Sequence, residues 1–184
     1  MKTIILMCHG EIMREETSAP EMWGLSLDGV MAAGKLFKDE IFSRVEQVFS
    51  STQRRAYDTA MILSGGVTLD SELDDVAWDE PCDGRLPSPE LQGSAAFTGA
   101  GEQMLRFIKG LADDMCEGEY ALAVSHPASI LAFLGFFCDI DNGEEAGISF
   151  RGRTICSGGP KMPSAFILEF ENGGISHIRY LERA

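Results

Sequence analysis

Two histidines of this chain stand at the ends of its two most apolar predicted strands. His9 ends the run TIILMCH, and His126 ends the run EYALAVSH. A third segment, VEQVFSS, stops shortly before Arg54 and Arg55, whose guanidinium groups can bind anions. The carboxyl ends of parallel strands meet at one edge of a sheet, where ligands gather. The pattern therefore predicts a catalytic site at such an edge, with imidazole and guanidinium groups around a small anion.

The elements that must position these residues alternate between strands and helices. The predicted strand 3–7 is apolar on both faces, as in the centre of a parallel sheet, and 119–126 is the second strongly apolar strand. A β-hairpin is predicted around Asn172 and Gly173 near the end of the chain. This order predicts a mostly parallel α/β sheet covered on both faces by helices. The predicted strands are 3–7, 45–50 and 119–126, and the predicted helices lie within 27–41, 50–66, 101–115 and 128–138.

The composition narrows the class of protein. The chain has 184 residues, of which 45% are hydrophobic, and this predicts one globular domain over 1–184. The net charge of −14 argues against a nucleic-acid partner or an anionic membrane surface. No run approaches the roughly 18 apolar residues of a membrane span. The five cysteines include no Cys-x-x-Cys pair, so we expect reduced thiols and a cytoplasmic location.

Three motifs, in order, resemble those of the histidine phosphatase superfamily, which includes the cofactor-dependent phosphoglycerate mutases. ILMCHGE resembles the ILVRHGE-type signature, FSSTQRRAYDTA resembles the Ser-Ser-x-x-x-Arg-Ala-x-x-Thr-Ala motif, and AVSHPASI resembles the strand that ends in Val-x-His. LSLDGVMAAGKL is similar to the Leu-Thr-x-x-Gly-x-x-Gln-Ala helix of that family. The likeness extends from residue 3 to about residue 135. It implies a three-layer α/β/α sandwich of the phosphoglycerate mutase type.

The resemblance also implies a role for each matched residue. His9 would be the nucleophile that attacks phosphorus, and His126 would stabilise the developing charge on the phosphate. Arg55 would bind phosphate oxygens with its fork of donors. Gly10 would allow the backbone to turn tightly beneath the phosphate. Because this chemistry depends on positioning and electrostatics, it requires no metal and no cofactor from this set of residues.

A general acid must protonate the leaving oxygen. In the family this acid is a Glu or Asp in a Leu-x-Glu pattern after the third strand. Here the pattern is Leu73-Asp74-Asp75, which favours Asp75, and Glu80 is the alternative. The stretch 79–100 that follows has three Pro, three Gly and no periodicity. We expect a loop there that sets the substrate.

The family motif has an arginine where this chain has Cys8 at the substrate-binding position. Removing one donor aimed at transition-state charge costs about 10²–10³ in rate. The sequence therefore leaves two functions open: a phosphatase for phosphomonoesters weakened by Cys8, or a catalytically impaired phosphate-binding or regulatory protein. A mutase-type phosphotransferase is a third alternative, although mutases of this family are generally longer. The candidates to replace the missing charge are Arg14, Arg54, Arg85, Arg151 and Arg153.

A rival interpretation makes Cys8 the nucleophile. Cys8 and Arg14 have the Cys-x₅-Arg spacing of the protein tyrosine phosphatases. However, Glu11 would then stand in the phosphate loop and repel the dianion, and the matches at Arg55 and His126 would be unexplained. We therefore favour the histidine chemistry. The sequence names neither the small phosphorylated substrate nor an oligomeric state, and a homodimer stays open.

Overall fold

The computed structural model describes residues 1–75, 85–143 and 146–182. Within these residues, a six-stranded sheet has the strand order β3-β2-β4-β1-β8-β9. The pairs β3–β2, β2–β4 and β4–β1 are parallel, whereas β8 is antiparallel to both β1 and β9. The mostly parallel sheet that the sequence predicts is thus confirmed. The strands are β1 (Lys2–Cys8), β2 (Gln47–Ser50), β3 (Thr68–Leu69), β4 (Tyr120–Ser125), β8 (Ser164–Glu171) and β9 (Gly174–Glu182).

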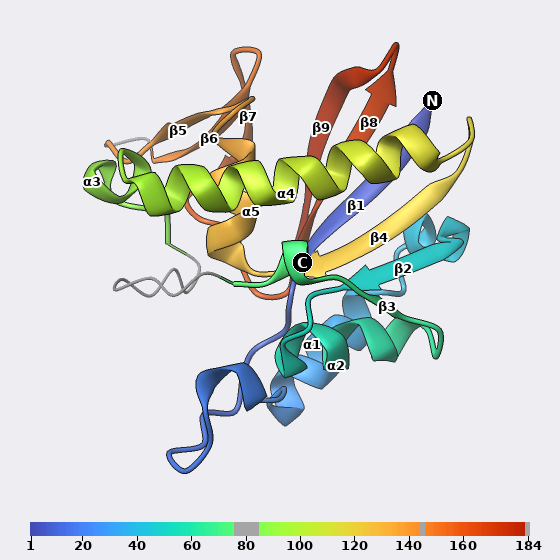
Figure 1. Ribbon diagram of the computed structural model, residues 1–184, viewed down its shortest axis with the longest axis vertical. Helices are drawn as coiled ribbons and strands as arrows, with labels where there is room; N and C mark the ends of the chain where they lie inside the picture. Colours follow the sequence, from blue (N-terminus) through green and yellow to red (C-terminus); the bar gives the residue numbers. More distant parts are fainter. Residues whose placement is uncertain (76–84, 144–145, 183–184) are drawn as a thin grey trace.

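Helices cover both faces of this sheet (Figure 1). Side chains alternate along a strand, so Ile4 and Leu6 of β1 pack on one side and Ile5 and Met7 on the other. The first side is covered by α4 and α5, and the second by α1 and α2. The three-layer α/β/α architecture is therefore confirmed. The helices are α1 (Leu27–Leu36), α2 (Arg54–Leu63), α3 (Pro89–Gln92), α4 (Ala95–Asp114) and α5 (Pro127–Leu134), with short 3₁₀ helices η1 (Pro20–Met22), η2 (Glu40–Arg44) and η3 (Ser71–Leu73).

The prediction of a loop over 79–100 is wrong from residue 89 onward. There α3 and the first turns of α4 form instead, and α4 begins at Ala95 rather than near residue 101. The Ser94 side chain accepts a hydrogen bond of 3.1 Å from the backbone N–H of Phe97, which caps the helix. Phe97 and Ala100 then bury against the core and stabilise this early turn. Residues 79–84 of the expected loop lie outside the described residues.

A second sheet, which the sequence analysis did not predict, follows α5. Its antiparallel strands are β5 (Asp139–Asp141), β6 (Gly147–Phe150) and β7 (Arg153–Ser157). Their alternation of apolar and polar residues is weak, which explains why the sequence did not reveal them. Figure 1 shows this small sheet beside one end of α4, and its strand β7 contacts β9 of the main sheet.

The ends of β1, β2 and β4 meet at one edge of the main sheet. Cys8 is in register with Ser125, and Ser50 is in register with Val124. The residue after each of these strands therefore reaches a shared edge, and Figure 1 shows β2 and β4 pointing the same way.

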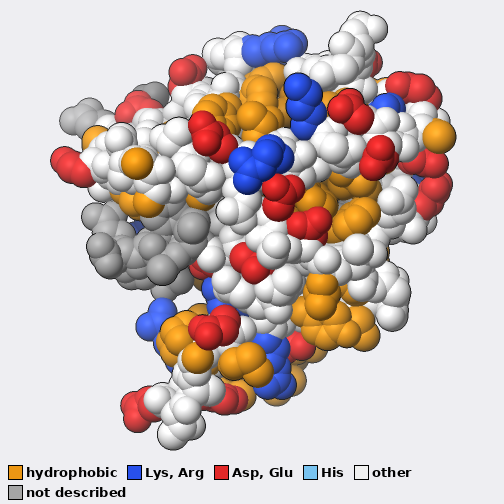
Figure 2. Space-filling model, in the orientation of Figure 1, with side chains coloured by type: hydrophobic (Ala, Val, Ile, Leu, Met, Phe, Trp, Pro, Cys, Tyr) orange, Lys and Arg blue, Asp and Glu red, His pale blue; other side chains and the backbone are white. Residues whose placement is uncertain are grey.

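The surface carries both signs of charge. Acidic and basic side chains of the described residues are interspersed on the face shown in Figure 2, with apolar side chains between them. Among the helices of the described ranges, none is long and apolar enough to cross a membrane.

Candidate active site

The structure brings the two strand-end histidines into contact. The ring centroids of His9 and His126 are 5.1 Å apart, with the rings edge to face at 64°. His9 is 4% exposed and His126 is fully buried. Such a contact leaves no space for a tetrahedral anion between the two rings. A phosphate that binds here must therefore meet the ring nitrogens at the edges of the rings.

Among the described residues, only one ring nitrogen of His9, Nδ1, has a hydrogen-bond partner. Its Nδ1 lies 2.7 Å from the carbonyl oxygen of Gly10. Because a carbonyl oxygen only accepts, Nδ1 carries the proton and the lone pair lies on Nε2. Burial lowers the pKa of His9 to about 4, despite its bond to Gly10. The imidazole is therefore neutral at neutral pH, which is the form that a nucleophile requires.

Gly10 sits where two backbone segments touch. A Cβ on Gly10 would lie 2.9 Å from the carbonyl oxygen of Gly29 in α1. Its backbone N–H donates to Thr59 Oγ1 at 3.1 Å, and that hydroxyl donates to the carbonyl of Arg55 at 2.7 Å. The turn after His9 is thus held against both α1 and α2, and only glycine fits at position 10.

Arg55 is a buried cation at this site, 8% exposed at the start of α2. Its Nε donates to Nδ1 of His126 at 3.2 Å, and its Nη1 donates to the carbonyl of Pro20 at 2.9 Å. Its Nη2 donates to Oδ2 of Asp75 at 3.1 Å. The preceding Arg54 is exposed and pairs with Asp58 at 3.4 Å. Of these two adjacent arginines, only Arg55 reaches the histidines.

Asp75 follows η3 and reaches the same cluster. In addition to its ion pair with Arg55, its Oδ2 lies 3.8 Å from Nδ1 of His126. Its side chain is 26% exposed, more than that of Arg55 or of either histidine. Glu80, the alternative acid, lies outside the described residues. Asp75 is therefore the candidate acid whose position can be stated.

Cys8 directly precedes His9, but its side chain belongs to the core. It is fully buried in the cluster that contains Ile4 and Leu6 and packs against α4 and α5. Burial raises the pKa of this thiol to about 12. The sulfur is then protonated at neutral pH, whereas a cysteine nucleophile must be a thiolate. The environment of Cys8 therefore disfavours the rival cysteine chemistry.

The arginines considered as substitutes for the missing charge are spread over the fold. Arg14 lies over the ring of Trp23, 5.9 Å from its centroid. The backbone N–H of Trp23 donates to the Pro20 carbonyl, the same oxygen that accepts from Arg55. Arg14 thus contacts Trp23, which lies in the same segment as Pro20, the residue that accepts a hydrogen bond from Arg55. Arg85 is exposed, Arg153 is exposed on β7, and Arg151 donates to the carbonyls of Ile175 and Ser176 near the hairpin turn of β8 and β9.

Two residues that sequence reasoning missed complete the cluster. Nε2 of His126 lies 2.9 Å from Oγ of Ser51, and this Oγ lies 2.6 Å from Oδ1 of Asp74. Ser51 is the second serine of the FSSTQRRAYDTA motif, and Asp74 stands between Leu73 and Asp75. Ser51 matches the motif, but the resemblance implied no role for it. Ser51 follows β2 and Asp74 follows η3, and the sequence spacing alone does not show that these two segments are in contact.

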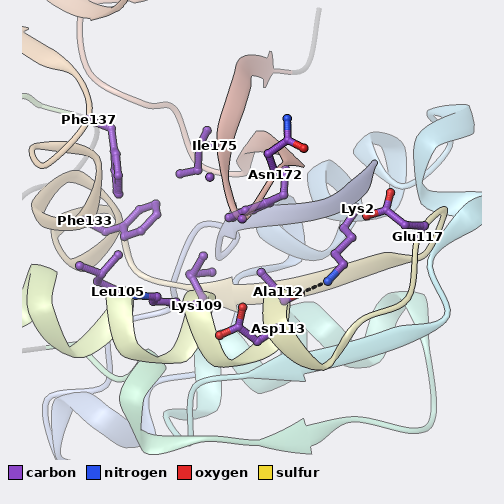
Figure 3. Close-up of a pocket in the computed structure, with 14 residues that line it drawn as sticks. Lys2, Leu105, Lys109, Ala112, Asp113, Glu117, Phe133, Phe137, Asn172 and Ile175 are labelled. Atoms are coloured by element: carbon purple, nitrogen blue, oxygen red, sulfur yellow. Dashed lines mark hydrogen bonds between the residues drawn. The ribbon is translucent and has the colours of Figure 1, made fainter.

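A pocket lies at the other end of β1, away from the histidines (Figure 3). Lys2 borders it at the start of the strand, and donates from Nζ to the carbonyl of Ala112 in α4 at 2.6 Å. Its volume is about 480 Å³, and its walls include Phe133, Phe137 and Ile175. A seven-residue strand spans roughly 20 Å, so this pocket is remote from His9.

The fold is that of a phosphoglycerate mutase-like α/β/α protein. Solved structures share this fold over nearly their whole length. Bacillus stearothermophilus YhfR is 20% identical with a TM-score of 0.67, covering 97% of this chain and 95% of its own. Mycobacterial glucosyl-3-phosphoglycerate phosphatase in complex with VO₃ is 17% identical with a TM-score of 0.65, covering 99% and 98%.

A mutant of phosphoserine phosphatase from Entamoeba histolytica, in complex with phosphoserine, shares the fold as well. It is 16% identical with a TM-score of 0.58, covering 97% of each chain. No protein-family model matches the sequence, and no curated protein matches it by sequence comparison. At these identities the likeness establishes the fold, and the chemistry must be argued from the residues.

Proposed function

We propose that this protein is a phosphatase that hydrolyses phosphomonoesters through a phosphohistidine on His9. The observation that carries the proposal is the unprotonated Nε2 of a neutral, buried His9 beside His126 and the Arg55 guanidinium. Sharing a fold with two proteins named as phosphatases supports this reaction class.

In the first half of the reaction, Nε2 of His9 would attack phosphorus and the bond from phosphorus to the ester oxygen would break. Arg55 would bind the phosphate oxygens, and His126 would stabilise their developing charge. Asp75 would give a proton to the leaving oxygen, for which it must first be protonated. A phosphate that draws Arg55 toward itself would weaken the ion pair between Arg55 and Asp75.

In the second half, water would attack phosphorus, pass a proton to the Asp75 carboxylate and break the bond from phosphorus to Nε2, which releases inorganic phosphate and returns His9 to its neutral form. No step requires a metal or a cofactor. We propose a small phosphorylated molecule as the substrate class, consistent with the phosphoserine bound by the Entamoeba histolytica mutant.

The second candidate function is a phosphate-binding or regulatory protein with impaired turnover. One observation favours it: position 8 holds a buried thiol instead of a second phosphate-binding guanidinium. Such a protein would bind inorganic phosphate or vanadate at His9 and Arg55 without turning over a phosphomonoester.

Hydrolysis of para-nitrophenyl phosphate distinguishes the phosphatase from the phosphate-binding protein. The assay compares the parent protein with His9→Gln, which serves as the inactive variant. Lys109→Gln is a suitable control, because Lys109 borders the remote pocket of Figure 3. We expect turnover that His9→Gln abolishes and Lys109→Gln leaves unchanged. Calorimetric binding of phosphate that depends on Arg55, without turnover by the parent protein, would instead favour the regulatory function.

A further inference from the structure

Nε2 of His126 begins a series of hydrogen bonds that has no part in the proposed reaction. The series runs from this Nε2 to Ser51 Oγ at 2.9 Å, and from Ser51 to Asp74 Oδ1 at 2.6 Å. Both His126 and Ser51 are fully buried. The chemistry of the partners fixes the direction of each bond.

Arg55 fixes the direction at one end. A guanidinium N–H can only donate, so its contact of 3.2 Å with Nδ1 of His126 requires a lone pair on that nitrogen. Burial, and then the neighbouring His9 and Arg55, hold the pKa of His126 well below its usual value. The ring is therefore neutral, and its single proton lies on Nε2 and is donated to Ser51.

Asp74 fixes the direction at the other end. A carboxylate only accepts, so the Ser51 hydroxyl donates to it. The Ser51 oxygen accepts from His126 and from the backbone N–H of Gln53 at 3.1 Å, which occupies both of its lone pairs. Asp74 is itself held by the backbone N–H and the hydroxyl of Thr52, at 2.6 Å and 2.7 Å. Each hydrogen bond in this series therefore has a defined donor and a defined acceptor.

We propose that Ser51 and Asp74 are positioning residues for His126, which keep Nε2 bonded inward and present Nδ1 to the phosphate. This rests on the proposed function, because that reaction brings a phosphate to His126. Nδ1 is the nitrogen that meets Arg55 and lies 3.8 Å from Asp75, so it faces the site. When Arg55 turns to the phosphate, Nδ1 would take a proton from the monoanionic phosphate ester, and the bond to Ser51 and the Asp74 carboxylate would stabilise the imidazolium that forms.

Nitrogen NMR of protein labelled with ¹⁵N-histidine tests this directly, because protonated and unprotonated ring nitrogens give different shifts and couplings. Assigned with His9→Gln and His126→Gln, the parent protein should show His9 protonated on Nδ1 and His126 on Nε2. In Ser51→Ala, Nε2 of His126 loses its acceptor, and the two tautomers should mix although Arg55 still favours the proton on Nε2. The same variant should lose about 10²-fold in kcat with KM little changed, because the ring is displaced.

Three further variants separate positioning from a general structural effect. Asp70→Asn removes a carboxylate that caps η3 by accepting the backbone N–H of Glu72 at 2.8 Å, and it should alter neither readout. Asp74→Asn should change the populations of the two His126 tautomers. This variant replaces Ser51→Ala in the test if Ser51→Ala does not fold. Ser51→Thr keeps the hydroxyl and should restore the parent tautomer.

The proposal is overturned by a His126 tautomer that is the same in the parent protein, Ser51→Ala and Asp74→Asn. It is also overturned by a parent His126 protonated on Nδ1 in the neutral ring. A parent protein without phosphatase activity would refute the proposed function instead, and the tautomer would still decide the role of Ser51 and Asp74.

Discussion

Replacement of Arg55 by lysine tests whether this residue acts through its several hydrogen-bond donors or only through its positive charge. Arg55 reaches three partners in different directions: His126, Pro20 and Asp75. A lysine ammonium is a single point and cannot span all three. One lost hydrogen bond to a charged group is worth about 1.5–3 kcal/mol, which is roughly 10- to 150-fold at 1.36 kcal/mol per tenfold. Loss of two such bonds to the phosphate predicts a fall in kcat/KM of about 10²-fold or more.

The assay is steady-state hydrolysis of para-nitrophenyl phosphate by Arg55→Lys beside Arg54→Lys. Arg54 is adjacent in sequence and has the same side chain, but it is exposed and bound to Asp58. Arg54→Lys should therefore leave kcat/KM within about twofold, as surface substitutions do. Equal losses in both variants, or a negligible loss in Arg55→Lys, would refute the assignment of Arg55 to the phosphate.

Three further outcomes follow from the geometry. The pKa of His9 falls from 6.5 to about 4 on folding, so the unfolded state binds more protons between these values and stability falls as pH drops. Urea unfolding at pH 7 and pH 5 should show a loss of about 2 kcal/mol from this group, absent in His9→Gln. A thiol reagent should label exposed Cys116 in the folded protein, and buried Cys8 only after unfolding. Gly10→Ala should destabilise by about 1–3 kcal/mol because its Cβ meets backbone, whereas Gly99→Ala, with open space in α4, should not.

The sequence predicted the centre of the fold well because its signals there are local. Apolar runs on both faces identify β1 and β4, and the Asn172-Gly173 turn identifies the β8–β9 hairpin. The start of α4 was missed because Ser94, its N-cap, stands in a stretch rich in glycine and proline. Burial of Phe97 outweighs that weak local preference.

The site was predictable where motif residues follow strands directly. His9 and His126 meet because β1 and β4 are parallel neighbours, and Arg55 joins them from the first turn of α2. The chain from Ser51 to Asp74 was not predictable, because it joins segments that only tertiary packing brings together. The burial of Cys8 was missed for the same reason: the sequence cannot show toward which layer a strand-end side chain turns.

The state of His9 during turnover tests the central claim most directly. The protein is mixed with a phosphomonoester, quenched rapidly in base, and the phosphorylated peptide is mapped by mass spectrometry. We predict phosphate on His9 that is stable in base and lost in acid. Acid-stable phosphate on Cys8, or turnover with no phosphate on the protein at any time, would contradict the account.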